Sequence, residues 1–144
     1  MFRILQVSTS EVLPLRSQIL RRGEPCSFPG DSLGSTFHFG VTQNGQILSV
    51  ATFLKESHAA LPKALNPYRL RGMATDSEHQ GQGLGGELLE FACQTLQNHQ
   101  VDALWCNARL SALRFYQKHA FQPFGESFEI PEIGPHLVLF RTPL

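Results

Sequence analysis

The glycine-rich turn at residues 80–86 constrains the fold of this 144-residue chain more than any other feature. Four glycines fall within six positions there, namely Gly81, Gly83, Gly85 and Gly86. Glycines at this density let the backbone curl so that several N–H groups point into one concavity, and the positive end of a following helix adds to the field. The turn is therefore expected to bind a pyrophosphate; the alternative is a simple connection between a strand and a helix.

Two other phosphate-binding motifs fit this turn less well. Gly81, Gly83 and Gly86 satisfy the pattern GxGxxG, but a dinucleotide fold places its first glycine directly after its first strand and an acidic residue at the end of the next one. Here five residues separate Thr75 from Gly81, a hairpin precedes the turn, and the next strand ends in residues 105–107, Trp-Cys-Asn. A NAD-binding oxidoreductase is disfavoured. A Walker loop is excluded because no Gly-Lys-Ser or Gly-Lys-Thr is present.

Hydrophobic spacing predicts the other elements. The dipeptide Asn44-Gly45 separates two β-rich runs, residues 37–42 and 46–54, and predicts a hairpin with a type I′ turn. The other expected strands are residues 2–7, 68–75, 103–106 and 137–141, and the expected helices are residues 12–22, residues 84–99 and one that Ser111 caps. This order predicts a mixed sheet with an antiparallel front half and a crossover at the second long helix.

Residues 23–34, which are rich in glycine and proline, and residues 56–67, which contain Pro62 and Pro67, are expected to be surface loops, and the first is a candidate binding loop. Gly72 within the predicted strand 68–75 indicates a bulge or a close backbone approach. Five arginines scattered over two elements are expected on solvated surface, namely Arg16, Arg21, Arg22, Arg69 and Arg71. The alternative for Arg21 and Arg22, which lie near the first of these loops, is contact with an anionic acceptor or with the phosphates of a cofactor.

Composition limits the classes of partner. Hydrophobic residues make up 42% and charged residues 17% of the chain, which predicts one folded domain over residues 1–144. Lys plus Arg and Asp plus Glu are 12 each, which argues against duplex DNA or an anionic membrane as a partner. No apolar run is long enough for a membrane span and the first residues do not resemble a signal peptide, so the protein is expected to be cytoplasmic.

Cysteine and histidine spacing predicts neither a disulfide framework nor a metal site. The three cysteines lack CxxC spacing, and the six histidines form no HExxH or i, i+4 pair. Cys106 with His136 as nucleophile and base is disfavoured, because no cationic neighbour in sequence would lower the pKa of the thiol.

The turn also carries a family resemblance. Residues 80–85 match the motif (Gln/Arg)-x-x-Gly-x-(Gly/Ala), so the chain resembles the GNAT N-acetyltransferase superfamily over residues 35–144. The downstream residues that look like the family's Asn…Ala…Phe-Tyr…Gly-Phe stretch are Asn107, Ala112, Phe115, Tyr116 and Phe121. The tail at residues 128–136 resembles a poorly characterised bacterial subgroup. The resemblance implies an α/β (α+β) fold: a central mixed β-sheet flanked by helices, with a V-shaped opening between strands 4 and 5 that holds acetyl-CoA.

Site roles follow from the resemblance. It implies that the backbone of residues 73–75 and Asn107 hydrogen-bond the pantetheine arm. It also implies that residues 80–85 hold the pyrophosphate and that Tyr116 is catalytic, near the thioester sulfur. The implied cofactor-binding set is Met73, Ala74, Thr75, Gln80, Gly81, Gln82, Gly83, Leu84, Gly85 and Asn107. The alternatives are a strand-end turn residue for Asn107 and a core aromatic for Tyr116. Ala120 stands where the family usually has a glycine, at a helix C-cap where positive φ is common, so strain of about 1 kcal/mol is expected.

The implied activity is acyl-CoA-dependent N-acyl transfer, most simply of acetyl from acetyl-CoA to a primary amine by direct attack, without a metal. The acceptor is a small molecule or a peptide that meets residues 23–36 and 125–136, and a homodimer is compatible with the sequence. The general base stays open between Glu78, His38, His136 and an ordered water. The competing interpretation is a non-catalytic domain that binds acyl-CoA or a nucleotide.

Overall fold

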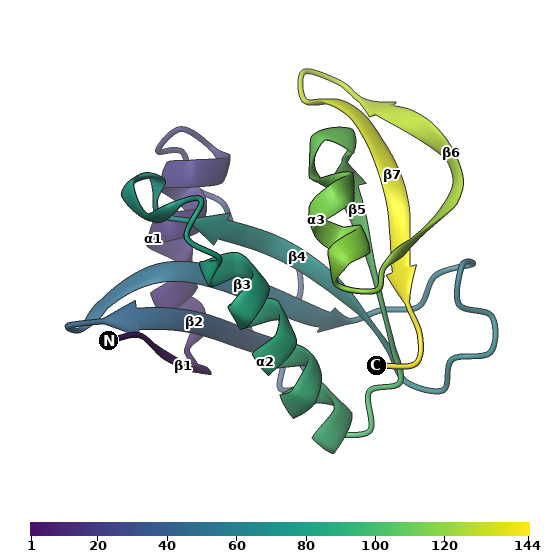
Figure 1. Cartoon of the computed structure of the whole chain (residues 1–144), viewed down its shortest axis with the longest axis horizontal. Coiled ribbons are helices and arrows are strands. Elements are labelled where there is room, and N and C mark those ends of the chain that lie inside the picture. Colours follow the sequence, from purple (N-terminus) through teal and green to yellow (C-terminus); the bar gives the residue numbers. More distant parts are fainter. The chain divides into compact units, whose positions relative to one another are not determined.

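The computed structural model describes residues 1–144 and shows a seven-stranded mixed sheet with the strand order β1-β2-β3-β4-β5-β7-β6 (Figure 1). The strands are β1 (Arg3–Gln6), β2 (Phe37–Gln43), β3 (Gln46–Lys55), β4 (Pro67–Thr75), β5 (Ala103–Arg109), β6 (Gln122–Ile130) and β7 (Gly134–Arg141). The α-helices are α1 (Thr9–Leu20), α2 (Leu84–Asn98) and α3 (Leu113–Lys118), with the short 3₁₀ helices η1 (Ser77–His79) and η2 (Leu110–Ala112). The predicted mixed α/β class is confirmed.

The crossover lies where the sequence predicts it. β1, β2 and β3 pair antiparallel in chain order, and β7 pairs antiparallel with both β5 and β6. β4 pairs with β5 in parallel, through the register of Pro67 to Arg69 against Ala103 to Trp105. A parallel pair needs a long connection, and α2 lies in it. This parallel pair fits the V-shaped opening that the resemblance implies between strands 4 and 5.

Several predicted boundaries are wrong. β6 is missing from the prediction because its residues are exposed at nearly every position, so no alternation of apolar and polar residues marks it. It is an edge strand that pairs only with β7, and Pro123 and Gly125 within it are typical of turns. Ser111 is not an N-cap: it lies in η2, and α3 begins after Ala112 without a side-chain cap. α1 begins earlier than predicted because Ser8 and Glu11 form a capping box.

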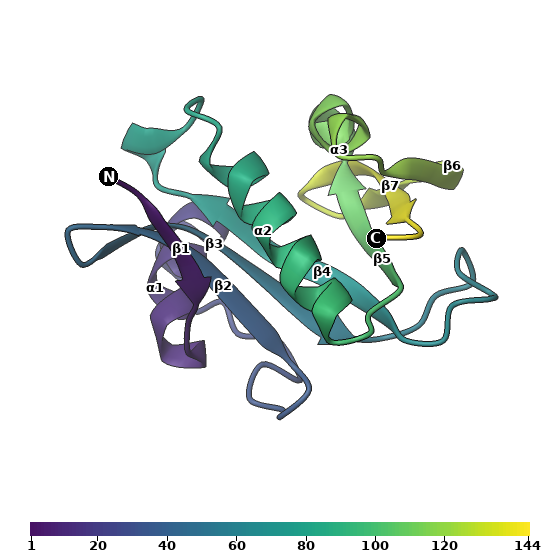
Figure 2. The same ribbon diagram turned by 60° about the horizontal axis from the view of Figure 1, so that its bottom comes forward.

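The fold contains two compact units, residues 1–54 with 70–95 and residues 55–69 with 96–144. In the first unit Asn44 and Gly45 both have positive φ, 52° and 77°, which confirms the two-residue hairpin. α1 packs Val12 and Leu15 against Val50 and Ala74, whereas α2 brings Phe91 edge-to-face onto Phe39 of β2. The two helices thus cover opposite faces of β1–β4, α2 in front and α1 behind in Figure 2.

In the second unit the hairpin of β6 and β7 continues the sheet beside β5, and α3 lies against one face of these strands (Figures 1 and 2). Leu61, Ala103 and Trp105 form a buried cluster, and the Trp105 indole N–H donates to the Glu56 carbonyl at 2.9 Å. The predicted loop 56–67 is therefore held against β5 by the Glu56 hydrogen bond and by Leu61.

Ala120 ends α3 in a Schellman motif. The Phe121 N–H donates to the Tyr116 carbonyl at 3.1 Å and the Ala120 N–H to the Gln117 carbonyl at 3.2 Å, with Ala120 at φ +65°. Because an L side chain in this region is strained, Ala120→Gly is expected to raise the free energy of unfolding by about 1 kcal/mol. In a chain of this size that is a rise in Tm of about 3 °C, measurable by differential scanning calorimetry.

The matched control is Ala112→Gly, at φ −98°, where glycine relieves no strain and should not stabilise. An Ala120→Gly protein no more stable than the parent would mean that the cap relaxes into another conformation.

Candidate functional site

The glycine-rich turn leaves its backbone donors open. Gly81 and Gly83 have φ of +78° and +82°, values that residues other than glycine rarely adopt. A Cβ at either position would meet nothing within 4 Å. The first amide of α2 to bond back along the chain is that of Glu87, to the Gly83 carbonyl at 3.1 Å. The N–H groups of residues 84–86 therefore have no partner within the helix, and the helix dipole adds partial positive charge at the same place. This open, concave backbone has the donors that a phosphate group needs.

Side chains tie this turn to the end of β4. Gln80 donates from Nε2 to the Thr75 carbonyl at 3.1 Å, so the residue expected at the pyrophosphate also braces the strand. Asp76 is the N-cap of η1: its carboxylate accepts from the Glu78 N–H at 3.2 Å and lies 2.8 Å from Nδ1 of His79. These bonds position the turn relative to residues 73–75.

In β4, Gly72 has a φ of +67°, and a Cβ there would lie 2.7 Å from Arg16 Nε and 2.8 Å from Phe28 Cε2. The close backbone approach that the sequence indicates is confirmed. Of the next three residues, Ala74 is buried against α1, whereas Met73 and Thr75 are half-buried. The backbone expected to receive pantetheine thus directly follows a kink that only glycine accommodates.

The second unit holds the other two predicted site residues. Asn107 lies within β5, opposite Val138 of β7, with an exposed side chain. The alternative of a strand-end turn residue is wrong, because β5 continues to Arg109. Tyr116 lies in α3, 9% exposed, with its ring edge-to-face against Phe115 and Phe121 at centroid distances of 5.1 and 5.2 Å.

Burial sets the protonation of the groups around Tyr116. Burial and, to a lesser extent, the neighbouring Cys106 raise the pKa of Tyr116 above its ordinary value, so the phenol stays protonated. Burial raises the pKa of the Cys106 thiol to about 12, although the charge of Arg69 opposes this. A neutral thiol is a poor nucleophile, which supports the prediction that Cys106 is not one.

The candidate bases differ in accessibility. Glu78 is exposed in η1. His136 is buried beside Phe128, with Nδ1 2.8 Å from the Gly134 carbonyl. His38 is buried, and Nδ1 lies 2.7 Å from Thr52 Oγ1 while Nε2 lies 2.8 Å from the Asp31 carbonyl. Both nitrogens of His38 are therefore engaged in structural hydrogen bonds.

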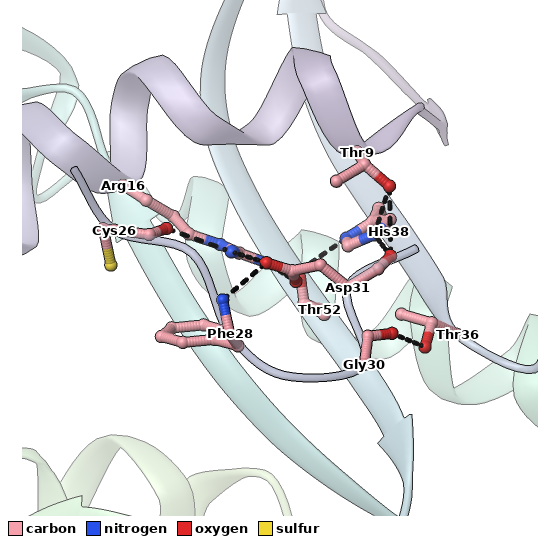
Figure 3. A network of polar contacts seen from close by, with 9 residues as sticks. All are labelled: Thr9, Arg16, Cys26, Phe28, Gly30, Asp31, Thr36, His38 and Thr52. Atoms are coloured by element: carbon pink, nitrogen blue, oxygen red, sulfur yellow. Dashed lines mark hydrogen bonds and ion pairs between the residues drawn. The ribbon is translucent and has the colours of Figure 1, made fainter. Parts of the chain in front are cut away.

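A buried polar network around Arg16 was not predicted (Figure 3). The side chain is fully buried and pairs with both carboxylate oxygens of Asp31, so the expectation of solvated surface is wrong for Arg16. The loop 23–34 is likewise not confined to the surface, since Cys26, Phe28 and Asp31 are buried. The burial of Arg16 could be suspected from the sequence only through its position, one helical turn after Val12 and so on the apolar face of α1.

No group of three or more His, Cys, Asp or Glu side chains is close enough together to hold a metal ion. The three cysteines are buried and form no disulfide. None of the helices is both long and apolar enough to cross a membrane.

Comparison with known proteins identifies the family of the chain. The sequence model of the Acetyltransferase (GNAT) family matches residues 4–121. The chain belongs to the GNAT family. Membership supports acyl-CoA N-acyltransferase activity. The match begins at residue 4, so it includes N-terminal residues that lie outside the resemblance over residues 35–144.

Individual relatives cover nearly the whole chain. It is 36% identical over a 145-residue alignment, 99% of this chain and 97% of the relative, to the uncharacterized N-acetyltransferase YitI of Bacillus subtilis. Among solved structures, Escherichia coli ElaA matches 98% of this chain and 99% of its own with a TM-score of 0.81 and 22% identity. A GNAT family acetyltransferase from Elizabethkingia anophelis, solved with acetyl-CoA bound, matches 98% of this chain and 97% of its own with a TM-score of 0.68 and 16% identity.

Proposed function

We propose that this GNAT protein transfers acetyl from acetyl-CoA to the primary amine of a small molecule or a peptide by direct attack. The observation that carries the proposal is the open cradle of residues 81–86, whose free N–H groups lie at the positive end of α2. Acetyl-CoA bound to the related acetyltransferase from Elizabethkingia anophelis supports the choice of donor.

The proposed binding roles follow the polarity of each segment. The N–H groups in residues 81–85 would bind the two phosphates, because residues 81–83 are exposed and the first amides of α2 have no intrahelical partner. The backbone of residues 73–75 would bind the pantetheine arm. The exposed amide of Asn107 supplies both a donor and an acceptor for the amide groups of that arm. When bound, acetyl-CoA supplies an activated thioester carbonyl.

The protein's chemical contribution would come from Tyr116. A departing thiolate needs a proton or a hydrogen bond, and a phenol kept protonated by burial offers one at every pH near neutrality. Since its pKa is raised, the hydroxyl stabilises the thiolate mainly by donating a hydrogen bond rather than by giving up its proton completely. The attacking amine must be neutral, and Glu78, His136 or an ordered water would take its proton.

The experiment is a screen for thiol release from acetyl-CoA with polyamines, amino acids, aminoglycosides and peptides. An acceptor-dependent release of thiol that matches the formation of an N-acetyl product supports the proposal. Calorimetry with coenzyme A and with NADH accompanies the screen. Tight binding of coenzyme A without turnover of any amine would favour the non-catalytic binding domain, and tighter binding of NADH would favour an oxidoreductase.

A further inference from the structure

Arg16 is at the centre of a closed ring of hydrogen bonds inside the first unit (Figure 3). Its Nη1 and Nη2 donate to the two oxygens of the Asp31 carboxylate at 2.9 and 2.8 Å, and Nη2 also donates to Thr52 Oγ1 at 2.6 Å. Thr52 Oγ1 also lies 2.7 Å from His38 Nδ1, and His38 Nε2 lies 2.8 Å from the Asp31 carbonyl. Since a carbonyl only accepts, His38 carries a hydrogen on Nε2 and donates it to Asp31. The hydrogen bonds thus run from Arg16 through Thr52 and His38 back to Asp31.

The ring holds the loop 23–36 against α1 and the sheet. Arg16 Nη1 donates to the Cys26 carbonyl at 3.3 Å, and the Phe28 N–H donates to the Asp31 carboxylate at 2.7 Å. The Thr9 hydroxyl donates to the Asp31 carbonyl at 3.0 Å. A segment without regular secondary structure is thus tied to α1 through the Cys26 carbonyl and through the carboxylate and carbonyl of Asp31. It is also the segment expected to meet the acceptor.

The same guanidinium also meets β4. Arg16 Nε is buried without a hydrogen-bond partner, and it lies 2.7 Å from where a Cβ at Gly72 would stand. Phe28 fills the other side of this space, with Arg16 Cζ 4.2 Å from the centre of its ring. The kink at Gly72 is therefore shaped by a loop residue and by the arginine that anchors the loop, immediately before residues 73–75.

A buried ion pair is an expensive way to stabilise a core, because a well-packed apolar cluster of the same volume does as well or better. Its advantage is geometry: a bidentate pair permits one orientation of the guanidinium, whereas apolar side chains permit several. That orientation places Nε and Cδ of Arg16 directly against the backbone of Gly72, 2.7 and 3.3 Å from where a Cβ would stand.

We propose that the Arg16–Asp31 pair is a positioning device that sets the backbone of β4 at residues 72–75 for coenzyme A and couples it to the loop 23–36. The inference rests on the proposed function, because it takes residues 73–75 as the pantetheine site. Arg16 is a positioning residue: it acts on the ligand through Gly72 and the backbone that follows.

The test compares Arg16→Lys with the parent by calorimetric titration of coenzyme A. Lysine keeps the charge but cannot make the bidentate pair together with the bonds to Thr52 and the Cys26 carbonyl. The dissociation constant for coenzyme A is expected to rise by about tenfold or more, the size expected when a shift of the β4 backbone weakens one or two hydrogen bonds to the ligand. Thr52→Val, which leaves the bidentate pair in place, is a milder variant that keeps the test open should Arg16→Lys not fold, and a rise of about threefold is expected for it.

The control separates position from stability. Val41→Ala removes two methyl groups from a buried residue of β2 that takes no part in the ring, and it should lower Tm without moving the dissociation constant by more than about twofold. All variants are titrated well below their Tm, so that only folded protein is measured. A structural role alone would make Arg16→Lys behave as Val41→Ala does.

Two failures have different signatures. Unchanged affinity for coenzyme A in folded Arg16→Lys and Thr52→Val, with normal affinity in the parent, overturns the inference and leaves the proposed function standing. A parent protein with no affinity for coenzyme A overturns both.

Discussion

Replacing Tyr116 by phenylalanine is expected to lower kcat by between about 100- and 10,000-fold, the usual range for a positioned proton or hydrogen-bond donor. The change removes only a hydroxyl, so the edge-to-face contacts of the ring with Phe115 and Phe121 remain. KM for acetyl-CoA should change little, because the hydroxyl acts on the leaving thiolate rather than on the bound ground state. Steady-state kinetics with the acceptor found by the screen measures both constants.

The chain offers a matched control in its only other tyrosine, Tyr68, which is also buried. Tyr68→Phe removes the same group from β4, and its kcat should stay within about threefold of the parent because it has no role in proton donation. If Tyr116→Phe behaves like Tyr68→Phe under conditions where chemistry limits the rate, Tyr116 is a core aromatic and water protonates the thiolate.

The pH dependence gives an independent check on the same group. Burial raises the pKa of Tyr116, so the phenol remains protonated well into the alkaline range. The ratio of kcat between parent and Tyr116→Phe should therefore be constant from about pH 6 to about pH 10, and any alkaline or acid limb should appear in both proteins. A ratio that falls toward one as the pH approaches 10 would show that the hydroxyl ionises there and that its environment is less apolar than the structure indicates.

Replacing Gly85 by glutamate is expected to weaken coenzyme A binding by about 100-fold or more. Two like charges about 4 Å apart near a protein surface repel by roughly 4 kcal/mol before screening, and each 1.4 kcal/mol is a factor of ten in affinity. Gly85 lies in the first turn of α2, outside the positive-φ positions, so a side chain there imposes no backbone strain. Isothermal titration calorimetry of the free protein with coenzyme A measures the loss.

The fold itself should tolerate this change. A carboxylate in the first turn of a helix interacts favourably with the dipole, so Tm without ligand should be equal to or above that of the parent. Gly85→Gln, which has the same size without the charge, is the matched variant and separates repulsion from steric exclusion. Undiminished affinity in a folded Gly85→Glu protein would place the phosphates elsewhere.

The parts of this protein that the sequence predicted correctly are those in which neighbouring residues decide the conformation. Asn44 and Gly45 adopt positive φ because asparagine tolerates this conformation and glycine has no Cβ to oppose it, whatever the strands around them pack against. The apolar spacing of α2 and the glycines of residues 81–86 likewise place a helix start after β4. Ala120 is also decided locally: the hydrogen bonds that end α3 require a positive φ, and Ala120 adopts +65° although its side chain disfavours this conformation.

Tertiary structure decided what depends on partners far along the chain. Arg16 is buried because Asp31 and Thr52, 15 and 36 residues away, accept its hydrogen bonds. No pattern of neighbouring residues predicts these partners. β6 forms because β7 offers it a pairing edge, although Pro123 and Gly125 in its own sequence are typical of a turn. The candidate site combines both kinds of information. The open backbone of residues 81–86 and the close approach at Gly72 could be predicted from the glycines themselves. Which side chains approach Gly72, and how far the pKa of Tyr116 is raised, depend on burial, which only the packed chain creates.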